Sequence, residues 1–258
     1  MKRIQLFELE DFAWFPSFLR DYMTRYILVV HEMIGTTEKL APILQDLIEK
    51  TNAELIQDTC SGAGGPMLDV YQRLERQKDV RLQLSDLYPH AGAIEALEKE
   101  PKKGLSYNQE SVDVLQHEFQ PNSIQTMICS FHHFSPEEAK KILKRAVDER
   151  RPICIFEISD NEAPTWLWWT AMLPAWIMTY FLTLKIRPLS SVQLFFTYCI
   201  QILPLCIAWD GAVSNARTYT EADLKELIAD LKENYCWEIQ KIKNKTPSKM
   251  LCLTGMPI

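Results

Sequence analysis

Residues 55–66, LIQDTCSGAGGP, join a short apolar run, an acid and a glycine-rich turn, and they decide the fold class. The pattern predicts a buried strand over 55–57 that ends at Asp58, then a tight turn, then a helix over 67–76. Small residues let the backbone approach a ligand, and the N-terminus of a helix offers free N–H groups. The turn suits a nucleotide-like ligand at the carboxyl end of a strand, but an ordinary strand-to-helix loop has the same pattern. The rest of the chain has to decide.

The composition limits the classes of protein to which the chain can belong. With 258 residues the chain is long enough to bury a substantial core within one domain. Its hydrophobic content of 47% and its charged content of 24% are typical of globular proteins. The net charge of −6 and the isoelectric point near 5.5 argue against a large nucleic-acid-binding surface, so no nucleic-acid partner is expected.

Cysteine usage and the N-terminal residues indicate a reducing compartment. The seven cysteines are odd in number and form no CxxC pair, and three of them fall in or beside expected buried strands. This argues for the cytosol and against a disulfide framework or a zinc site, and no metal site is expected. Residues 1–12, MKRIQLFELEDF, contain no long apolar run, so we do not expect a secretory signal there.

Strands and helices are expected to alternate through the middle of the chain. Residues 4–34 mix aromatic and charged side chains and predict one or two amphipathic helices, and 39–50 predicts a further helix. Strands are then expected over 55–57, 80–84, 105–108, 124–130 and 152–158, with helices between them. Ser135, Pro136 and Glu138 predict the capped start of one such helix. Five strands separated by helices predict a parallel, doubly wound α/β sheet of the Rossmann-like type.

An apolar insertion follows the fifth strand. Residues 166–184 and 191–209 form two apolar arms of nineteen residues each, joined by a link that contains Lys185 and Arg187. Three interpretations stay open: a helical cap over a hydrophobic substrate pocket, an element that lies on a membrane surface, and a hairpin that spans a bilayer. Prolines in both arms and the basic link count against the spanning hairpin.

The chain closes with a helix capped by Thr220 and two strands over 235–243 and 250–256, joined by a polar turn. These complete a seven-stranded, mostly parallel sheet with a closing antiparallel pair. We expect a single domain over residues 1–258. Its expected parts are an N-terminal aromatic helical segment (1–38), an α/β core (39–160 and 218–258) and the apolar insertion (161–217).

Three acids lie at or after the carboxyl ends of three successive strands, namely Asp58, Asp86 and Asp113. Asp86 follows the glycines by about twenty residues, a spacing that suits hydrogen bonds to ribose hydroxyls. Asp113 follows the third strand, where a carboxylate can accept from an exocyclic amine. A nicotinamide-binding protein would show GxGxxG, which this turn does not.

This spacing, the alternating units and the closing pair resemble the class I S-adenosylmethionine-dependent methyltransferases over roughly residues 39–160 and 218–258. The segments DTCSGAGGP, SDLYP, SFHHFSPEEAKKIL and WDGAVSNARTYTEADL resemble a bacterial subfamily whose substrate is unknown. The resemblance implies S-adenosyl-L-methionine as the cofactor, with its methionine part on the first acid and the turn, its ribose on the second acid and its adenine on the third. The cofactor-binding residues it implies are Asp58, Cys60, Ser61, Gly62, Gly64, Asp86, Leu87, Asp113, Ser130 and Phe131. Because Cys60 replaces the usual first glycine, the turn is expected to have an L-residue's backbone angles there.

Other residues are candidates for catalysis and substrate binding. His132 and His133 follow the fourth strand, where one of them could act as a general base. Alternatively, one packs on the cofactor and the other caps a loop. Glu157 lies in an apolar strand and needs a partner if it is buried; Arg217 is one candidate, unless it binds an anionic group of the substrate. The substrate candidates are Glu157, Trp166, Asp210, Arg217 and Tyr219.

These features predict a methyltransferase that acts on a hydrophobic small molecule or a lipid-like acceptor, in the cytoplasm or peripheral to the inner face of the membrane. The alternative is a non-catalytic ligand-binding or membrane-associated protein that retains the fold. The sequence lacks an Asn-Pro-Pro-Tyr or Asp-Pro-Pro-Tyr segment and a Pro-Cys pair after the fourth strand, so methylation of DNA bases is not expected.

Overall fold

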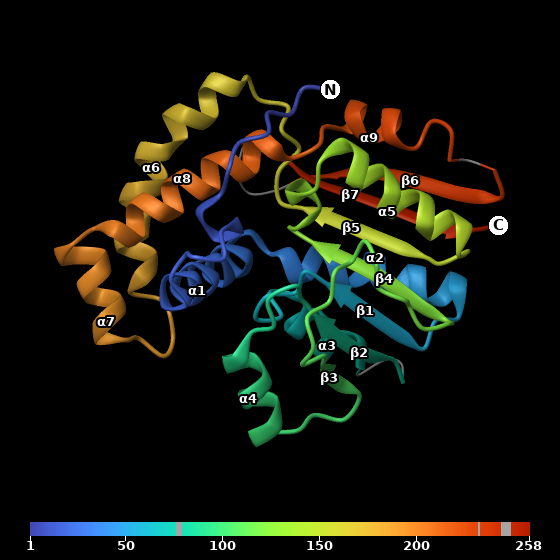
Figure 1. Cartoon of the computed structure of the whole chain (residues 1–258), viewed down its shortest axis with the longest axis horizontal. Helices are drawn as coiled ribbons and strands as arrows, with labels where there is room; N and C mark the ends of the chain where they lie inside the picture. Colours follow the sequence, from blue (N-terminus) through green and yellow to red (C-terminus); the bar gives the residue numbers. More distant parts are fainter. Residues whose placement is uncertain (76–78, 232, 244–248) are drawn as a thin grey trace.

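The computed structural model describes residues 1–75, 79–231, 233–243 and 249–258, and one seven-stranded sheet forms its centre (Figure 1). The strands are β1 (Leu55–Thr59), β2 (Arg81–Ser85), β3 (Leu105–Tyr107), β4 (Ser123–Ile128), β5 (Ile153–Glu157), β6 (Tyr235–Ile242) and β7 (Met250–Pro257). Their order in the sheet is β3-β2-β1-β4-β5-β7-β6. Strands β1 to β5 pair in parallel, and β7 runs antiparallel to both β5 and β6.

The predicted Rossmann-like sheet with a closing antiparallel pair is confirmed, and its strand order is that of the methyltransferase fold. The chain runs outward from β1 to β3 and then crosses back to place β4 on the other side of β1. In an open α/β sheet, ligands bind outside the carboxyl ends of the strands at such a reversal. Most of the predicted turn over 243–249, and Arg76 at the end of a predicted helix, lie outside the described residues.

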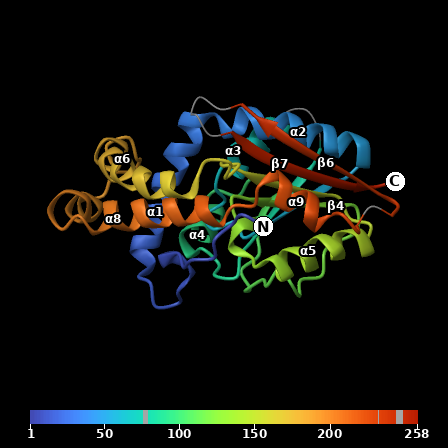
Figure 2. The same ribbon diagram turned by 90° about the horizontal axis from the view of Figure 1, so that it is seen from above.

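Helices cover both faces of the sheet, because the central strands alternate their apolar side chains between two layers. In β5, Cys154 and Phe156 join the core under α2 and α3, whereas Ile153 and Ile155 join the core under α5 and α9. The covering helices are α2 (Thr36–Thr51), α3 (Met67–Glu75), α5 (Pro136–Asp148) and α9 (Glu221–Leu227), while α4 (Ala91–Lys99) lies beside β3. Figure 2 shows α2 and α3 on one side of the sheet and α5 and α9 on the other. Two-sided burial accounts for the continuous apolar run of β5.

The predicted cap of α5 is confirmed. The hydroxyl of Ser135 accepts a hydrogen bond from the backbone N–H of Glu138, and the Glu138 carboxylate accepts one from the N–H of Ser135 at 2.9 Å. This reciprocal pair satisfies two N–H groups that a helix start would otherwise leave unpaired. Thr220 caps α9 in the same way, together with Asp223.

The insertion and the N-terminal segment form a helical layer beyond the carboxyl ends of the parallel strands (Figure 1). Its elements are α1 (Ser17–Ile34), α6 (Thr165–Thr183), α7 (Ser191–Leu194), the single π-turn η3 (Phe195–Cys199) and α8 (Ile202–Arg217). Helix α1 packs against α6 and α8 through a third apolar core that includes Tyr22, Tyr26, Leu182 and Leu203. Of the aromatic residues of the N-terminal segment, Phe15, Tyr22 and Tyr26 are core residues of this layer, whereas Phe7, Trp14 and Phe18 are exposed.

Among the described residues, no single helix has both the length and the apolarity needed to cross a bilayer. The segments Ser191–Cys199 and Ile202–Arg217 reach that threshold only as a pair, and the pair is bent by 79° at its break. The outer side of α6 nevertheless exposes a row of large apolar side chains, and three of them are more than 60% exposed. The members of that row are Trp166, Trp169, Leu173, Ile177, Phe181 and Leu184.

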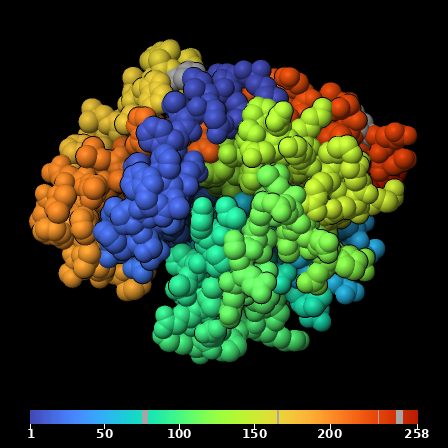
Figure 3. Space-filling model, viewed as in Figure 1, coloured from blue at the N-terminus to red at the C-terminus, as the bar shows by residue number. Residues whose placement is uncertain are grey.

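Residues 1–11, which we call the N-terminal strap, run along α8 and end in the short 3₁₀ turn η1 (Leu9–Asp11). The backbone N–H of Ile4 donates to the carbonyl of Ala216 at 2.8 Å. The carboxylate of Asp210 accepts from the N–H groups of Leu9 and Glu10. In Figure 3 the blue N-terminal residues lie between the orange residues of α7 and α8 and the green half of the sheet domain. The strap thus joins the helical layer to the edge of the sheet.

Candidate functional site

The glycine-rich turn after β1 follows a left-handed path. Cys60, Gly62, Gly64 and Gly65 have φ angles of 57°, 52°, 94° and 46°. The expectation that Cys60 would impose ordinary L-residue angles was therefore wrong, because the cysteine adopts the conformation that glycine usually supplies. The turn keeps the glycine-type path even where its first glycine is replaced.

Two glycines of the turn have different roles. A Cβ on Gly64 would lie 2.9 Å from Leu68 and 3.1 Å from Leu84, so this glycine is needed where the turn packs on its own helix and on β2. A Cβ on Gly62 would meet nothing within 4 Å. The backbone at Gly62 is therefore open on the side where a side chain would otherwise stand, which is the property that close approach by a ligand requires.

Asp86, directly after β2, is held against this turn. Its carboxylate accepts hydrogen bonds from the N–H of Gly62 at 2.8 Å and from the N–H of Tyr88 at 2.9 Å. The hydroxyl of Tyr107, on β3, donates to the carbonyl of Gly62 at 2.8 Å. The ends of β1, β2 and β3 are thereby tied together, and each carboxylate oxygen of Asp86 keeps a free lone pair for a further donor.

The loop after β3 brings Asp113 to the same edge. The N–H of Val112 donates to the carbonyl of Asp86 at 2.9 Å, and the hydroxyl of Ser111 donates to the carbonyl of Leu87 at 2.6 Å. The Asp113 carboxylate accepts from the N–H of Leu115, so it also caps the turn that follows it. Leu87 is exposed beside these groups.

Asp58, at the end of β1, is a buried member of the same cluster. It is 2% exposed and accepts a hydrogen bond from the hydroxyl of Thr126 on β4 at 2.5 Å. Burial raises the pKa of Asp58 to about 7, although the hydrogen bond opposes this. The hydroxyl of Ser61 donates to the Asp58 carbonyl at 2.8 Å, which closes the start of the turn.

The segment after β4 forms a short 3₁₀ turn, η2 (Phe131–His133), and its first residues are buried. Ser130 precedes this turn and is 4% exposed. The ring of Phe131 lies 5.3 Å from the ring of Tyr219, whose hydroxyl donates to the carbonyl of Phe134 at 2.8 Å. Tyr219 therefore holds the η2 turn from the side of α9, a contact that its candidacy as a substrate residue did not include.

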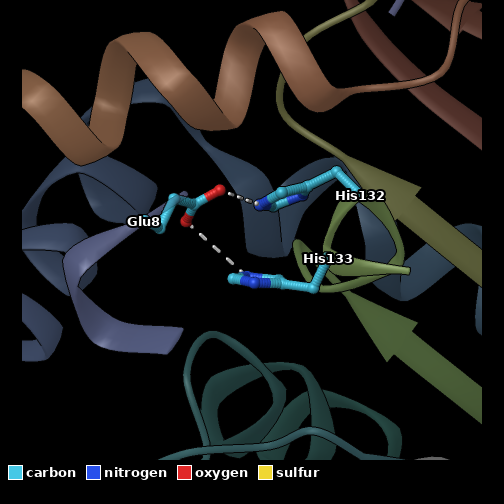
Figure 4. A group of neighbouring side chains, drawn as sticks. All are labelled: Glu8, His132 and His133. Atoms are coloured by element: carbon cyan, nitrogen blue, oxygen red, sulfur yellow. Dashed lines mark ion pairs between the residues drawn. The ribbon is translucent and has the colours of Figure 1, made fainter. Parts of the chain in front are cut away.

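His132 lies between two buried acids, Glu157 and Glu8, and Figure 4 shows the contact with Glu8. Its Nδ1 is 2.9 Å from a carboxylate oxygen of Glu157, and its backbone N–H donates to the other oxygen at 3.1 Å. Its Nε2 is 3.7 Å from Glu8. The contact with Glu157 follows from the sheet, because Glu157 ends β5 and β5 pairs in parallel with β4.

His133 also lies between two acids. Its Nδ1 is 2.8 Å from a carboxylate oxygen of Asp11, and its Nε2 is 3.8 Å from Glu8. The two imidazole rings lie 4.4 Å apart, centre to centre. The structure thus brings both sequence-predicted histidines together with two acids of the N-terminal strap.

Glu8 is the residue that sequence reasoning missed. It is fully buried, and burial raises its pKa to about 8. Burial alone would also raise the pKa of Asp11, but the contacts with His133 and Arg217 outweigh it and hold that pKa well below its usual range. Glu8 lies in a short segment without helical or strand periodicity, so no local signal in the sequence distinguishes it from a surface acid.

Arg217 has different partners from those predicted. The suggested pairing with Glu157 is not formed; instead Nη1 of Arg217 lies 3.1 Å from Glu8 and 2.5 Å from Asp11. Its Nη2 donates to the carbonyl of His133 at 2.9 Å. Glu157 is buried as expected, but its partner is His132.

The remaining substrate candidates lie apart from one another. Asp210 is buried and holds the strap through Leu9 and Glu10. Trp166 is 63% exposed at the start of α6. Two cavities, of about 260 and 730 Å³, lie elsewhere: one is lined by α2, β6 and β7, the other by the loops at the amino ends of β4 and β5. Because neither touches the glycine turn, the candidate site is defined by that turn and the histidine cluster.

Models of known protein families give no match, and neither do curated proteins. Among solved structures, many class I S-adenosylmethionine-dependent methyltransferases are similar at low identity. The mitomycin 7-O-methyltransferase is 14% identical, with 81% of this chain and 50% of that chain covered and a TM-score of 0.48.

Two further solved structures are similar in the same way. An O-methyltransferase from neocarzinostatin biosynthesis, in complex with S-adenosyl-L-homocysteine and 1,4-dihydroxy-2-naphthoic acid, is 11% identical, with 85% of this chain and 57% of that chain covered and a TM-score of 0.48. The magnesium protoporphyrin IX methyltransferase of Synechocystis PCC 6803 is 10% identical, with 87% and 79% covered and a TM-score of 0.47. The chain spans about half the length of the first structures that it matches. At these identities and TM-scores the similarity says nothing of what this chain binds or acts on.

Proposed function

We propose that this protein is an S-adenosylmethionine-dependent methyltransferase that acts on a hydrophobic small molecule or a lipid-like acceptor. The observation that supports it most directly is the contact between Asp86 and Gly62 at the point where the strand order reverses. Asp86, at the end of β2, offers a carboxylate to the ribose hydroxyls. Gly62, at the end of β1, offers open backbone to the part of the cofactor that is attached to the ribose.

The residues present fit this cofactor. Gly62 and Gly65 leave open backbone, and Asp86 and Asp113 supply two carboxylates on adjacent loops. By resemblance, Asp58, Cys60, Ser61 and Gly64 would hold the methionine part, Asp86 and Leu87 the ribose, and Asp113 the adenine, with Ser130 and Phe131 beside them. When bound, the cofactor supplies an electrophilic methyl group on a sulfonium. The protein then has to align an acceptor and remove its proton where necessary.

The apolar face of α6 supports the choice of acceptor and a place of action. Residues 163–209 contain no acidic residue, and their only charges are Lys185 and Arg187, which are both exposed. An apolar row next to basic side chains is the composition of a surface that lies on anionic lipid. We therefore propose that the enzyme acts in the cytoplasm, at the inner face of the membrane, on a lipid-like acceptor.

Calorimetry with S-adenosylhomocysteine, the demethylated product, tests the cofactor assignment. We expect micromolar binding by the wild type. Asp86→Ala should weaken it by roughly ten- to one hundredfold, because a hydrogen bond to a charged group contributes about 1.5–3 kcal/mol. Asp69→Ala, an exposed acid on α3, is the matched control and should bind as the wild type does. Unchanged binding in a folded Asp86→Ala variant would overturn the assignment.

The alternative function, a membrane-associated binding protein that keeps the fold, is favoured by the same exposed face of α6. The two are separated by incubating the protein with isotopically labelled S-adenosylmethionine and a bacterial lipid extract. Transfer of label to an extractable lipid or small molecule supports the methyltransferase. Binding to vesicles without any transfer, under conditions where the cofactor binds, supports the alternative.

A further inference from the structure

Glu8, His132 and His133 each direct one metal-ligating atom toward a common point (Figure 4). These atoms all lie within 4.8 Å of one another. Nε2 of His132 lies 3.7 Å from Oε1 of Glu8, and Nε2 of His133 lies 3.8 Å from Oε2 of Glu8; both distances exceed the range of an N–H···O hydrogen bond. They are close to the separation of about 3.4 Å between two ligands of a tetrahedral ion whose ligand bonds measure about 2.0–2.1 Å.

The outer nitrogen of each imidazole is fixed by a carboxylate. Nδ1 of His132 faces Glu157 at 2.9 Å, and Nδ1 of His133 faces Asp11 at 2.8 Å. A carboxylate is an acceptor, so each Nδ1 carries the proton, and in the neutral ring Nε2 is then left with a lone pair. This carboxylate–histidine arrangement is the one that orients histidine ligands in metal sites.

The three inward-facing groups do not satisfy one another. Neither carboxylate oxygen of Glu8, nor Nε2 of His132, has a hydrogen-bond partner among the residues that the structure describes. Glu8 and His132 are both more than nine-tenths buried. The guanidinium of Arg217 lies 3.1 Å from Oε1 of Glu8 but forms no hydrogen bond with Nε2 of His132, so a cation or a proton between Glu8 and His132 would satisfy both buried acceptors.

The charges around the cluster leave room for a cation. The carboxylates of Glu8, Asp11 and Glu157 face the imidazoles, against the guanidinium of Arg217 and that of Arg3, which donates to the carbonyl of His132 at 2.8 Å. With neutral imidazoles, and with Glu8 deprotonated as a metal ligand has to be, these five groups have a net charge of −1. A divalent cation with one anionic fourth ligand would bring the cluster to neutrality.

We propose that Glu8, His132 and His133 form a binding site for a divalent first-row transition-metal ion, for which Zn²⁺ is the best match. Two imidazole nitrogens and one carboxylate are a donor set that Zn²⁺ takes in open, catalytic-type sites. Asp11 and Glu157 are the positioning residues of this site, and Asp210 acts through the strap that carries Glu8.

Three protein ligands leave a fourth position open. This position lies at the turn after β4, at the carboxyl edge of the sheet beside the glycine turn. It would take an oxygen or sulfur atom of the acceptor and stabilise it as an anion, with its proton released to water. This part of the inference rests on the proposed function, whereas binding of the metal does not.

Titration of the chelator-treated full chain with ZnCl₂ in a calorimeter tests the site, with CoCl₂ as a spectroscopic probe. We expect one equivalent of Zn²⁺ to bind and Co²⁺ to give the intense visible bands of a four-coordinate ion. Glu8→Gln and His133→Ala should each weaken Zn²⁺ binding by roughly tenfold or more. Glu8→Gln keeps the volume of a buried side chain and His133 is partly exposed, so both variants are expected to fold. His117→Ala, outside the cluster, is the matched control.

Two results would overturn the site: no Zn²⁺ or Co²⁺ uptake by the wild type, or an affinity in folded Glu8→Gln and His133→Ala equal to that of His117→Ala. The test is independent of the cofactor. Zn²⁺ binding without any S-adenosylhomocysteine binding would sink the proposed function and leave the metal site standing. S-adenosylhomocysteine binding without Zn²⁺ uptake would overturn the metal site and leave the proposed function standing.

Discussion

The buried carboxyl of Asp58, beside the glycine turn, makes the stability of the folded protein depend on pH. Its ordinary pKa of about 3.9 is raised to about 7 in the folded protein, chiefly by burial. Between these values the unfolded chain has lost the proton while the folded chain keeps it. The folded state therefore binds more protons, and the contribution of this group to stability, complete below about pH 4, is lost as the pH rises through 7.

We expect Asp58→Asn to flatten the dependence of stability on pH. The wild type should lose stability between pH 5 and pH 8, whereas the asparagine, which can still accept from Thr126, has no proton to lose. Melting temperatures across this range, in the absence of ligand, give the two slopes. Glu8 and Asp210 also have raised pKa values, so the variant should keep part of the slope. Identical slopes would contradict the role of Asp58.

The histidines are the second case at the residue scale. His133→Ala removes the hydrogen bond between His133 and Asp11, and it leaves the contacts of the glycine turn unchanged. We expect turnover to fall by at least about tenfold while the affinity for S-adenosylhomocysteine stays within about twofold, since general-base or metal chemistry contributes to the reaction step. Measured kcat and calorimetric Kd separate the two effects. Full turnover in both His132→Ala and His133→Ala would remove the histidines from the mechanism.

Helix α6 has two unlike sides. Its inner side packs on α1 and α8, and its outer side exposes Leu173 and Phe181, each at 62%. Exposed apolar rows of this kind mark an interaction surface rather than ordinary solvent contact. Because this row is exposed, we propose that the insertion is an element that lies on a membrane surface.

The double substitution Leu173→Glu and Phe181→Glu should abolish binding to phosphatidylglycerol vesicles. Each substitution removes an apolar side chain whose burial in the membrane contributes about 1.5–3 kcal/mol, and it adds a negative charge that the anionic lipid repels. The affinity should therefore fall more than about one hundredfold. Vesicle sedimentation gives the bound fraction. Ile258→Glu, at an exposed apolar position on the far side of the sheet, is the control and should sediment as the wild type does.

Local sequence signals predicted the elements well and their long-range contacts poorly. The capping box at Ser135 and the two-sided burial of β5 depend on neighbours within a few residues, so both could be predicted. The partner of Arg217 could not, since three acids compete for it and only the packed fold selects Glu8 and Asp11. Glu8 lies 124 positions before His132, and no spacing rule connects them.

At the scale of the whole molecule, the candidate site lies where two layers meet. The α/β core supplies the glycine turn and the histidines, and the helical layer supplies Asp210 and Arg217. The strap connects them, because its backbone donates to Asp210 while its side chains face the histidines. The geometry of the cluster therefore depends on how firmly the strap is held.

We expect Asp210→Ala to loosen the strap. It leaves two backbone N–H groups without their acceptor and should cost about 1–3 kcal/mol in the free energy of unfolding. Asp210→Asn, which keeps one acceptor oxygen, should recover part of that loss. Urea denaturation measures the stability, and S-adenosylhomocysteine affinity should stay normal in both variants because the strap does not bond to the glycine turn. Equal stability of the wild type and Asp210→Ala would contradict the anchoring role.

The attachment of the strap also sets an order of assembly during synthesis. The hydrogen bond between Leu9 and Asp210 joins residues 201 positions apart. A ribosome makes the chain from its amino to its carboxyl end, so Glu8 is made well before α8 and cannot dock until α8 has emerged. The glycine turn and its acids can come together well before that. The nascent chain would thus form the glycine turn with its acids before it forms the histidine cluster, and any reaction that needs the cluster would have to wait for α8.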